Sequence, residues 1–290
     1  MGINEEQLQL NRTGFKRLVE QLGVKTGIIY HGQLNKTTKF SPETPLGHLH
    51  LVRRGTVVIE TEDNNPIYIS KPTAIFFPRS TPHRIYTKTD PVDTDITCAE
   101  INYAIGQNNL LINSFEAVMS IELTRALFLL PLIDLIDREQ QTEQLGGATI
   151  CNQLMNVFVI YMLRHACEEK TQKPGVIALL IHKHFGGLVE QIFADITHPW
   201  QIECMAKKCH MSRASFAKQF KQVSGQTPND FLCHVRIQAA MQGLQQGQTT
   251  QFVANQIGYS SVSALNKLFA KYVGTSPKQW LSEQIIQKTH

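Results

Sequence analysis

The spacing of apolar and polar residues divides the chain into two parts. Residues 24–103 contain short β-branched and aromatic runs, separated by turns rich in Asn, Gly, Pro and Ser. Such runs predict short antiparallel strands that form a small barrel or sandwich. From about residue 113 the apolar positions follow a helical period, over 114–123, 127–144 and 147–170. The pattern therefore predicts an α+β protein whose first half is rich in strands.

The segment 168–175, EEKTQKPG, is charged, lacks large apolar residues and contains a Pro-Gly pair, which is typical of a linker. Beyond it the whole chain has a helical period. We expect a first domain at 1–168, a linker at 169–176 and a helical domain at 177–290. The helices expected after the linker span 176–194, 200–208, 212–223, 228–246, 250–257, 261–272 and 277–287.

One motif occurs twice in the helical region. Residues 215–232 read SFAKQFKQVSGQTPNDFL, and residues 264–281 read ALNKLFAKYVGTSPKQWL. At a constant offset of 49 residues, Gly225 aligns with Gly274, and a Thr-Pro pair aligns with a Ser-Pro pair. Gly is favoured just after a helix, and Pro at the first position of one. Each copy therefore predicts a helix that ends at Gly, followed by a helix that begins at Pro.

A supporting helix and a short turn precede each copy, which is the layout of a helix-turn-helix unit. In the first unit Phe216 and Phe220 are four residues apart and face the core, as Leu265 and Phe269 do in the second. The opposite faces are then free to enter the major groove of double-stranded DNA. The residues expected on those faces are Arg213, Ala214, Ala217, Lys218 and Lys221 in the first unit, and Val262, Ser263, Asn266, Lys267 and Lys271 in the second.

The expected helix at 228–246 connects the two units. About 19 residues at about 1.5 Å each give a rod of about 28 Å, close to the ~34 Å of one DNA turn. The duplication therefore favours a protein that contacts two successive turns of DNA. The alternative is a plain helical packing domain, in which the duplicated caps and polar outer faces need another reason to exist.

The charge distribution agrees with an anionic partner for the second half. Residues 175–290 contain 11 Lys and Arg against 5 Asp and Glu, whereas residues 1–174 contain 17 against 19. The six cysteines show no paired spacing, which favours a reducing compartment. The first 15 residues lack the apolar core of a secretory signal, and the apolar run 150–163 is shorter than the roughly 20 residues that span a bilayer. We therefore predict a cytoplasmic protein with no membrane partner.

The sequences MSRASFAKQFKQVSGQTPNDFLCHVRIQAAMQGL and VANQIGYSSVSALNKLFAKYVGTSPKQWL resemble the two DNA-binding units of the AraC/XylS family of bacterial transcription regulators. The resemblance covers about 178–287. It implies that the outward residues of both units, apart from Lys221 and Lys271, contact DNA bases. It also implies a mainly structural role for Arg236 in the connecting helix. Since Val262 is a poor hydrogen-bonding residue, we expect the second helix to contribute more phosphate contact than base specificity.

The first half resembles the cupin-type sensor domain of a subgroup of this family. The matching pieces are HLHLVRRG (48–55), FFPRSTPH (76–83) and, more loosely, TCAEINY (97–103). His48 and His50 alternate on one strand and so point to one face, and His83 follows a Pro-rich turn. Three neutral imidazoles can bind zinc or iron, but the Glu that enzymatic cupins carry is absent. Histidines that pack in the barrel, or that hydrogen-bond a ligand, are the other interpretations.

Cys98 lies late in the expected barrel. Some regulators of this subgroup sense oxidants through thiols, whereas a lone Cys in a strand is more often an inert core residue. No G-x-S-x-G, Walker loop or dinucleotide glycine pattern indicates an enzyme. The alternative class is a cupin-type metalloenzyme or metal-binding protein that uses His48, His50 and His83.

We therefore predict an N-terminal cupin-like β-barrel, a helical dimerisation segment between residues 113 and 168, and two C-terminal helix-turn-helix units. The predicted function is a sequence-specific transcription regulator, an activator and not an enzyme, with no cofactor. The barrel is expected to sense a small molecule or chemical stress, and the expected partners are DNA, RNA polymerase and a second copy of the chain. Candidate effector-binding residues are His48, His50, His83 and Cys98. The lysines expected to neutralise DNA phosphates are Lys207, Lys208, Lys218, Lys221, Lys267 and Lys271.

Overall fold

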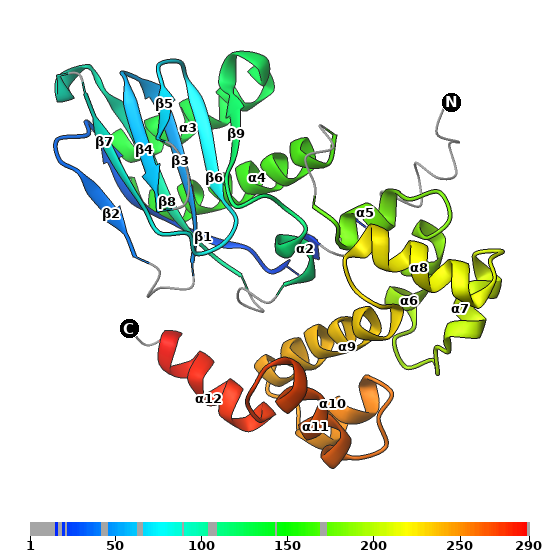
Figure 1. Cartoon of the computed structure of the whole chain (residues 1–290). Helices are drawn as coiled ribbons and strands as arrows, with labels where there is room; N and C mark the ends of the chain where they lie inside the picture. Colours follow the sequence, from blue (N-terminus) through cyan, green and yellow to red (C-terminus); the bar gives the residue numbers. More distant parts are fainter. Residues whose placement is uncertain are drawn as a thin grey trace. The chain divides into compact units, whose positions relative to one another are not determined.

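The computed structural model describes residues 15–288, except 17–18, 21, 42–45, 63–65, 89, 104–108, 143 and 169–172 (Figure 1). Its contacts divide the chain into two units. The N-terminal unit contains Leu22–Asn108 and Phe115–Gln172, and the C-terminal unit joins Met1–Gln21 and Asn109–Ser114 to Lys173–His290. Half of the expected linker, 169–172, lies outside the described residues, as do residues 1–14, on which the prediction about a secretory signal rests.

The N-terminal unit contains two antiparallel sheets, with strand orders β1-β8-β3-β6-β9 and β2-β7-β4-β5. The prediction of a β-rich first half is therefore confirmed. The apolar run 48–62 forms two strands, because Gly55 turns the chain with a φ of 89°. The strands are β1 (Lys25–Gly32), β2 (Thr38–Phe40), β3 (Gly47–Arg54), β4 (Val57–Thr61), β5 (Ile67–Ile69), β6 (Thr73–Phe77), β7 (His83–Thr87), β8 (Asp95–Asn102) and β9 (Met119–Glu122).

An apolar core joins the two sheets. It combines Val52, Ile75 and Phe77 of the first sheet with Ile59 and Ile85 of the second. Strand β3 is central in its sheet and is buried continuously from Gly47 to Val52. A strand that is buried along its whole length has both faces covered, so polar side chains on β3 lie inside the unit.

The N-terminal unit also contains two long helices, α3 (Leu130–Thr142) and α4 (Gly147–Glu168). Helix α4 contacts β1 through Asn152. The Thr26 hydroxyl donates to the Asn152 backbone carbonyl at 2.6 Å, and the Asn152 side-chain oxygen accepts the Ile28 N–H at 3.3 Å. None of the described helices has both the length and the apolar content needed to cross a bilayer.

The expected helix at 114–123 is wrong. Its last part forms β9, which pairs with β6, and is followed by a short 3-10 helix at Leu123–Arg125. Met119 and Ile121 are buried while Ser120 is exposed, so the true period of this stretch is two residues. Strand β2 has only three residues, which are too few for a periodic signal in the sequence.

The C-terminal unit is helical. Its helices after the linker are α5 (Val176–Ile181), α6 (Gly186–Ala194), α7 (Ile202–Lys208), α8 (Arg213–Ser224), α9 (Pro228–Gln245), α10 (Thr250–Gln256), α11 (Val262–Tyr272) and α12 (Pro277–Lys288). The helix expected at 176–194 is broken at 182–185. Gly186 and Gly187 favour a break, and the turn buries Phe185 with its ring centroid 5.4 Å from that of Phe220.

A segment between β8 and β9 belongs to the C-terminal unit. It forms α2 (Leu110–Asn113), whose side-chain cap is Asn109. The next residue, Ser114, accepts the Val176 N–H on its hydroxyl at 3.0 Å. A Cβ on Gly175 would lie 2.3 Å from that hydroxyl oxygen, so only glycine fits there. Residues 109–114, which were expected in the first domain, therefore belong to the C-terminal unit.

Candidate nucleic-acid interface

The first helix-turn-helix unit consists of α7 and α8. The Ser212 hydroxyl caps α8 by accepting a backbone N–H of its first turn at 3.3 Å. The helix ends at Gly225 in the left-handed conformation, with a φ of 76°. Phe216 and Phe220 are fully buried, as expected from their spacing. These contacts fix which face of α8 remains open.

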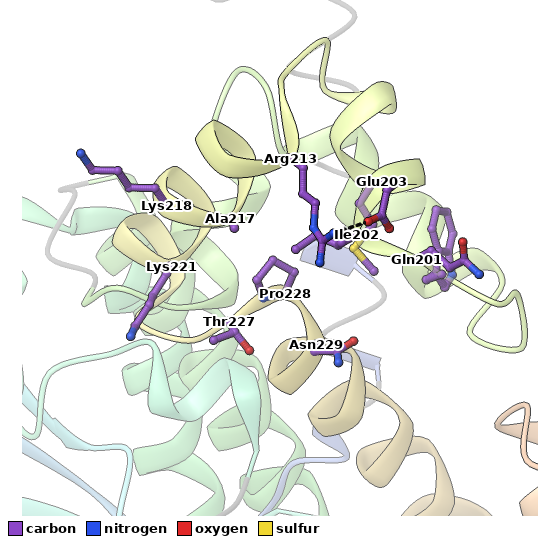
Figure 2. A pocket seen from close by; sticks show the side chains of 12 residues that line it. Gln201, Ile202, Glu203, Arg213, Ala217, Lys218, Lys221, Thr227, Pro228 and Asn229 are labelled. Carbon is purple, nitrogen blue, oxygen red and sulfur yellow. Dashed lines mark ion pairs between the residues drawn. The ribbon is translucent and has the colours of Figure 1, made fainter.

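The open face of α8 carries the expected residues. Arg213, Ala214, Lys218 and Lys221 are exposed, and Ala217 is half-buried. Most of this face lines a groove of about 630 Å³ between α7, α8 and the beginning of α9 (Figure 2). The lining residues are Trp200, Gln201, Ile202, Glu203, Met205, Arg213, Ala217, Lys218, Lys221, Thr227, Pro228 and Asn229.

One acidic side chain lies in this groove. Glu203, from the first turn of α7, places a carboxylate oxygen 2.9 Å from Nη1 of Arg213. Figure 2 shows the two side chains directed toward each other across the groove. Glu203 has no signal in the sequence as a site residue, because ten residues separate it from Arg213 and only the turn between the helices brings the two together.

The second unit, α10 and α11, repeats this arrangement. The Ser261 hydroxyl caps α11 at 3.2 Å, and Leu265 and Phe269 are fully buried. Ser263, Asn266, Lys267 and Lys271 are exposed and Val262 is half-buried, so the second expected set also lies on an open face.

Arg236 of α9 connects the two units. Its Nε donates to the Ile196 carbonyl and its Nη2 to the His198 carbonyl, each at 3.0 Å. The guanidinium also lies 5.4 Å from the ring centroid of Tyr259, in the turn of the second unit. The expected structural role of Arg236 agrees with these contacts, which join the loop before α7 to the second turn.

Tyr272 fixes α11 to α9. Its hydroxyl donates to the Asp230 carboxylate at 2.7 Å, and that carboxylate also accepts the hydroxyl of Thr227, the α9 cap, at 2.6 Å. Hydrogen bonds from Thr227 and Tyr272 lower the pKa of Asp230. Tyr272 is half-buried, since its hydroxyl keeps this polar contact.

All six lysines expected to neutralise phosphates are exposed. Two have partners within the unit. Lys208 donates to the Gln191 side chain at 2.6 Å and lies 5.8 Å from the Trp200 ring centroid, and Lys271 donates to the Tyr272 hydroxyl at 3.1 Å. The ammonium groups of Lys208 and Lys271 must therefore give up these hydrogen bonds before they can contact a phosphate.

The three candidate histidines meet inside the N-terminal unit, in the space between its sheets. His48 and His50 come from β3, and His83 comes from β7 of the other sheet. All three are buried. The ring of Phe77 stacks on His83 with centroids 3.9 Å apart, and Phe40 contacts all three imidazoles.

The hydrogen bonds of the cluster fix its proton positions. His83 Nδ1 lies 2.7 Å from the Thr81 carbonyl oxygen, so it donates its hydrogen there. In the neutral ring Nε2 is then an acceptor, and it lies 2.8 Å from Nε2 of His50. Nδ1 of His50 and Nδ1 of His48 are buried without a hydrogen-bond partner. The cluster therefore contains unpaired polar atoms in an apolar core.

The histidines are neutral near pH 7. Burial lowers the pKa of His48 to about 4 and that of His83 to about 4, and it also depresses the pKa of His50. The cluster does not fit a metal centre. Two imidazole nitrogens that share a zinc ion at about 2.0–2.1 Å lie about 3.3 Å apart, whereas the two Nε2 atoms are at hydrogen-bond distance. Among the described residues no group of three His, Cys, Asp or Glu is arranged to hold a metal ion.

Cys98 faces the same interior. It is the cross-strand neighbour of His50 on β8 and belongs to the apolar core. Burial raises the pKa of its thiol, so the reactive thiolate is disfavoured. The six cysteines are all free.

Comparisons with known proteins agree with this arrangement. Residues 15–168 match the Cupin family, and residues 205–283 match the Helix-turn-helix domain family. The chain is 24% identical to the RCS-specific HTH-type transcriptional activator RclR of Escherichia coli (strain K12) over 80% of this chain and 82% of that protein. It is 26% identical to an HTH-type transcriptional regulator of Haemophilus influenzae, over 86% and 93%. A structure of ToxT from Vibrio cholerae is 13% identical over 89% of this chain and 98% of that one, with a TM-score of 0.41.

The fold and the open helix faces define a DNA-binding transcription regulator with a cupin domain before two helix-turn-helix units. The chain belongs to the AraC-type family of these regulators.

Proposed function

We propose that this chain activates transcription by placing α8 and α11 in successive major grooves of double-stranded DNA. The observation that carries the proposal is the pair of open helix faces, on α8 and α11, which both begin at a serine cap. Helix α9, with 18 residues at about 1.5 Å each, spans about 27 Å. That length approaches the ~34 Å between equivalent positions of successive grooves.

Within this interface the two helices have different tasks. Arg213 can donate two hydrogen bonds to a guanine. Asn266 can donate one hydrogen bond to an adenine and accept one from it. The exposed lysines neutralise phosphates, so affinity falls steeply as salt concentration rises. Activation is proposed because RclR, which is similar over most of both chains, is an activator. An activator bound in this way contacts RNA polymerase.

Selection of bound fragments from genomic DNA by the full-length protein tests the proposal. The expected result is enrichment of fragments that share two short conserved elements about 10 base pairs apart. Recovery of fragments with no common element would contradict it. Transcription in vitro with RNA polymerase on an enriched fragment then tests activation: the transcript should increase when the protein is added.

The N-terminal unit is the proposed effector site, at the histidine cluster. Buried polar atoms normally have partners, so the unpaired Nδ1 atoms of His48 and His50 favour a ligand that hydrogen-bonds there. Cys98 lies beside the cluster, and we propose that it lines the effector site as a neutral thiol and does not act as a reactive thiolate. A reporter strain exposed to small metabolites and to hydrogen peroxide tests this. The response should be lost in His48→Phe and retained in Cys98→Ala.

Metal analysis of the purified protein separates the effector site from the metal-binding alternative. The hydrogen bond between His50 and His83 occupies the nitrogens that a metal needs. Zinc and iron are therefore expected well below one ion per chain. Stoichiometric metal would support the cupin-type metalloenzyme or metal-binding protein instead.

Helix α4 is the proposed surface for a second copy of the chain. Its buried residues face the unit, while Ile150, Leu154, Val157 and Tyr161 form a second apolar stripe with spacings of four, three and four. Ile150 is 41% exposed and Val157 39% exposed. Alternate spacings of three and four are typical of helices that pair. Val157→Glu should convert the dimer to a monomer in sedimentation runs, and a wild-type monomer at micromolar concentration would reject the interface.

A further inference from the structure

The groove beside α8 combines three cations with one acid. Arg213, Lys218 and Lys221 line it, and Glu203 is its acidic lining residue. A carboxylate in a DNA-facing groove repels phosphate, so its presence requires a reason. The Glu203 carboxylate lies 2.9 Å from Nη1 of Arg213, the first residue of α8.

The ion pair has little value for fold stability. The Arg213 side chain is 69% exposed and that of Glu203 51% exposed. Exposed pairs of this kind contribute little to stability, and salt screens them. The pair therefore acts mainly on the position and the charge of the guanidinium.

The helix ends explain why Arg213 needs a partner. The first turn of a helix carries partial positive charge, which disfavours a cation there and favours an anion. Arg213 begins α8, whereas Glu203 lies in the first turn of α7. Without Glu203 the guanidinium would move outward and pair with whichever phosphate is nearest.

We infer that Glu203 is a positioning residue that sets the specificity of Arg213, an inference that rests on the proposed function. In the free protein Glu203 holds the guanidinium over the groove and repels phosphate from it. A guanine edge presents two acceptors, which the remaining N–H donors of Arg213 can reach while Nη1 keeps its contact with Glu203. On a duplex without that edge, the guanidinium can reach a phosphate only by leaving Glu203. Glu203 thus lowers affinity for arbitrary DNA more than for the preferred site.

The test measures dissociation constants of the full-length protein for two duplexes over a range of salt concentrations. One duplex is the sequence that wild type selects from a random pool, and the other is a scrambled version of it. The variants are Glu203→Gln, Arg213→Ala and the double variant. Glu283→Gln is the matched control, because it removes the same charge from an exposed residue of α12 that does not line the groove.

Glu203→Gln should raise affinity for the scrambled duplex about two- to fivefold at low salt, in line with an exposed ion pair. Affinity for the selected duplex should change less, so the ratio between the two falls. In the Arg213→Ala background the substitution should have no effect on that ratio. Glu283→Gln should preserve it.

Two results would overturn the inference. The first is an unchanged ratio in Glu203→Gln, that is, an equal change or no change on both duplexes, which a purely structural role produces. The second is the same change of the ratio in the Arg213→Ala background or in Glu283→Gln, which a general charge effect produces. If wild type itself shows no preference between the duplexes, the proposed function fails and the inference fails with it.

Discussion

The two helix-turn-helix units have the same framework but different outer faces. Helices α8 and α11 both begin at a serine cap. Helix α8 has Gly225 as its C-cap, whereas α11 has Val273, one residue before the left-handed Gly274. Both bury an aromatic ring at the equivalent position, Phe220 or Phe269. At the offset of 49 residues the outer faces share only one lysine position, Lys218 and Lys267, whereas Arg213 aligns with Val262. The comparison teaches that the framework determines where a helix lies, while the exposed residues determine what it reads.

The turns of the two units also differ. Each contains one residue in the left-handed region: His210, with a φ of 55°, and Gly258, with a φ of 82°. His210 is exposed, whereas a Cβ on Gly258 would lie 2.8 Å from the Thr197 carbonyl oxygen. The second turn is therefore packed against the loop that Arg236 also holds, and the first turn is free of that constraint.

The largest expected effect concerns these turns. Gly258→Ala should destabilise the C-terminal unit by about 2–4 kcal/mol, from the left-handed conformation and the close approach to Thr197 together. His210→Gly should leave stability unchanged or slightly higher. Urea unfolding followed by tryptophan fluorescence measures this, since both tryptophans, Trp200 and Trp280, lie in this unit. Equal effects of the two substitutions would show that the turns are not different.

The next effect concerns base recognition. Arg213→Ala should cost about 1–3 kcal/mol on the selected duplex and relax base choice at one position. Lys267→Ala should weaken binding to every duplex by a similar factor and reduce the salt dependence by about one charge. Binding assays on single-base variants of the duplex distinguish the two. A uniform loss for Arg213→Ala would make it a phosphate contact instead.

A smaller loss of stability, equal in the two units, is expected when the serine N-caps of α8 and α11 are replaced. Ser212→Ala and Ser261→Ala each remove one side-chain acceptor from a helix N-terminus and should each cost about 1 kcal/mol of stability. The same fluorescence measurement applies. Clearly unequal losses would mean that the two frameworks are not equivalent.

The smallest effect is expected at Val262. This half-buried residue has no side-chain hydrogen-bonding group, so Val262→Ala should change affinity less than twofold on any duplex. A fluorescence anisotropy titration with the selected duplex measures it. A loss comparable to that of Arg213→Ala would assign Val262 an apolar contact with a thymine methyl group.

Local signals in the sequence predicted much of this framework. The Gly and Pro positions and the four-residue spacing of the buried apolar residues are all short-range features, and the helices they predict lie within two residues of the observed ones. The strand at 119–122 was missed because its partner, β6, is remote in sequence. The Arg213–Glu203 pair and the docking of Ser114 on Val176 likewise require the folded chain. No periodicity encodes contacts of that kind.

The most direct test of the central claim is methylation interference on the selected duplex, because methylation at N7 of guanine blocks the major groove. The account predicts two clusters of interfering guanines on one face of the duplex, about 10 base pairs apart, with one cluster lost in Arg213→Ala. A single cluster, or interference only from minor-groove methylation, would contradict the placement of α8 and α11 in successive major grooves.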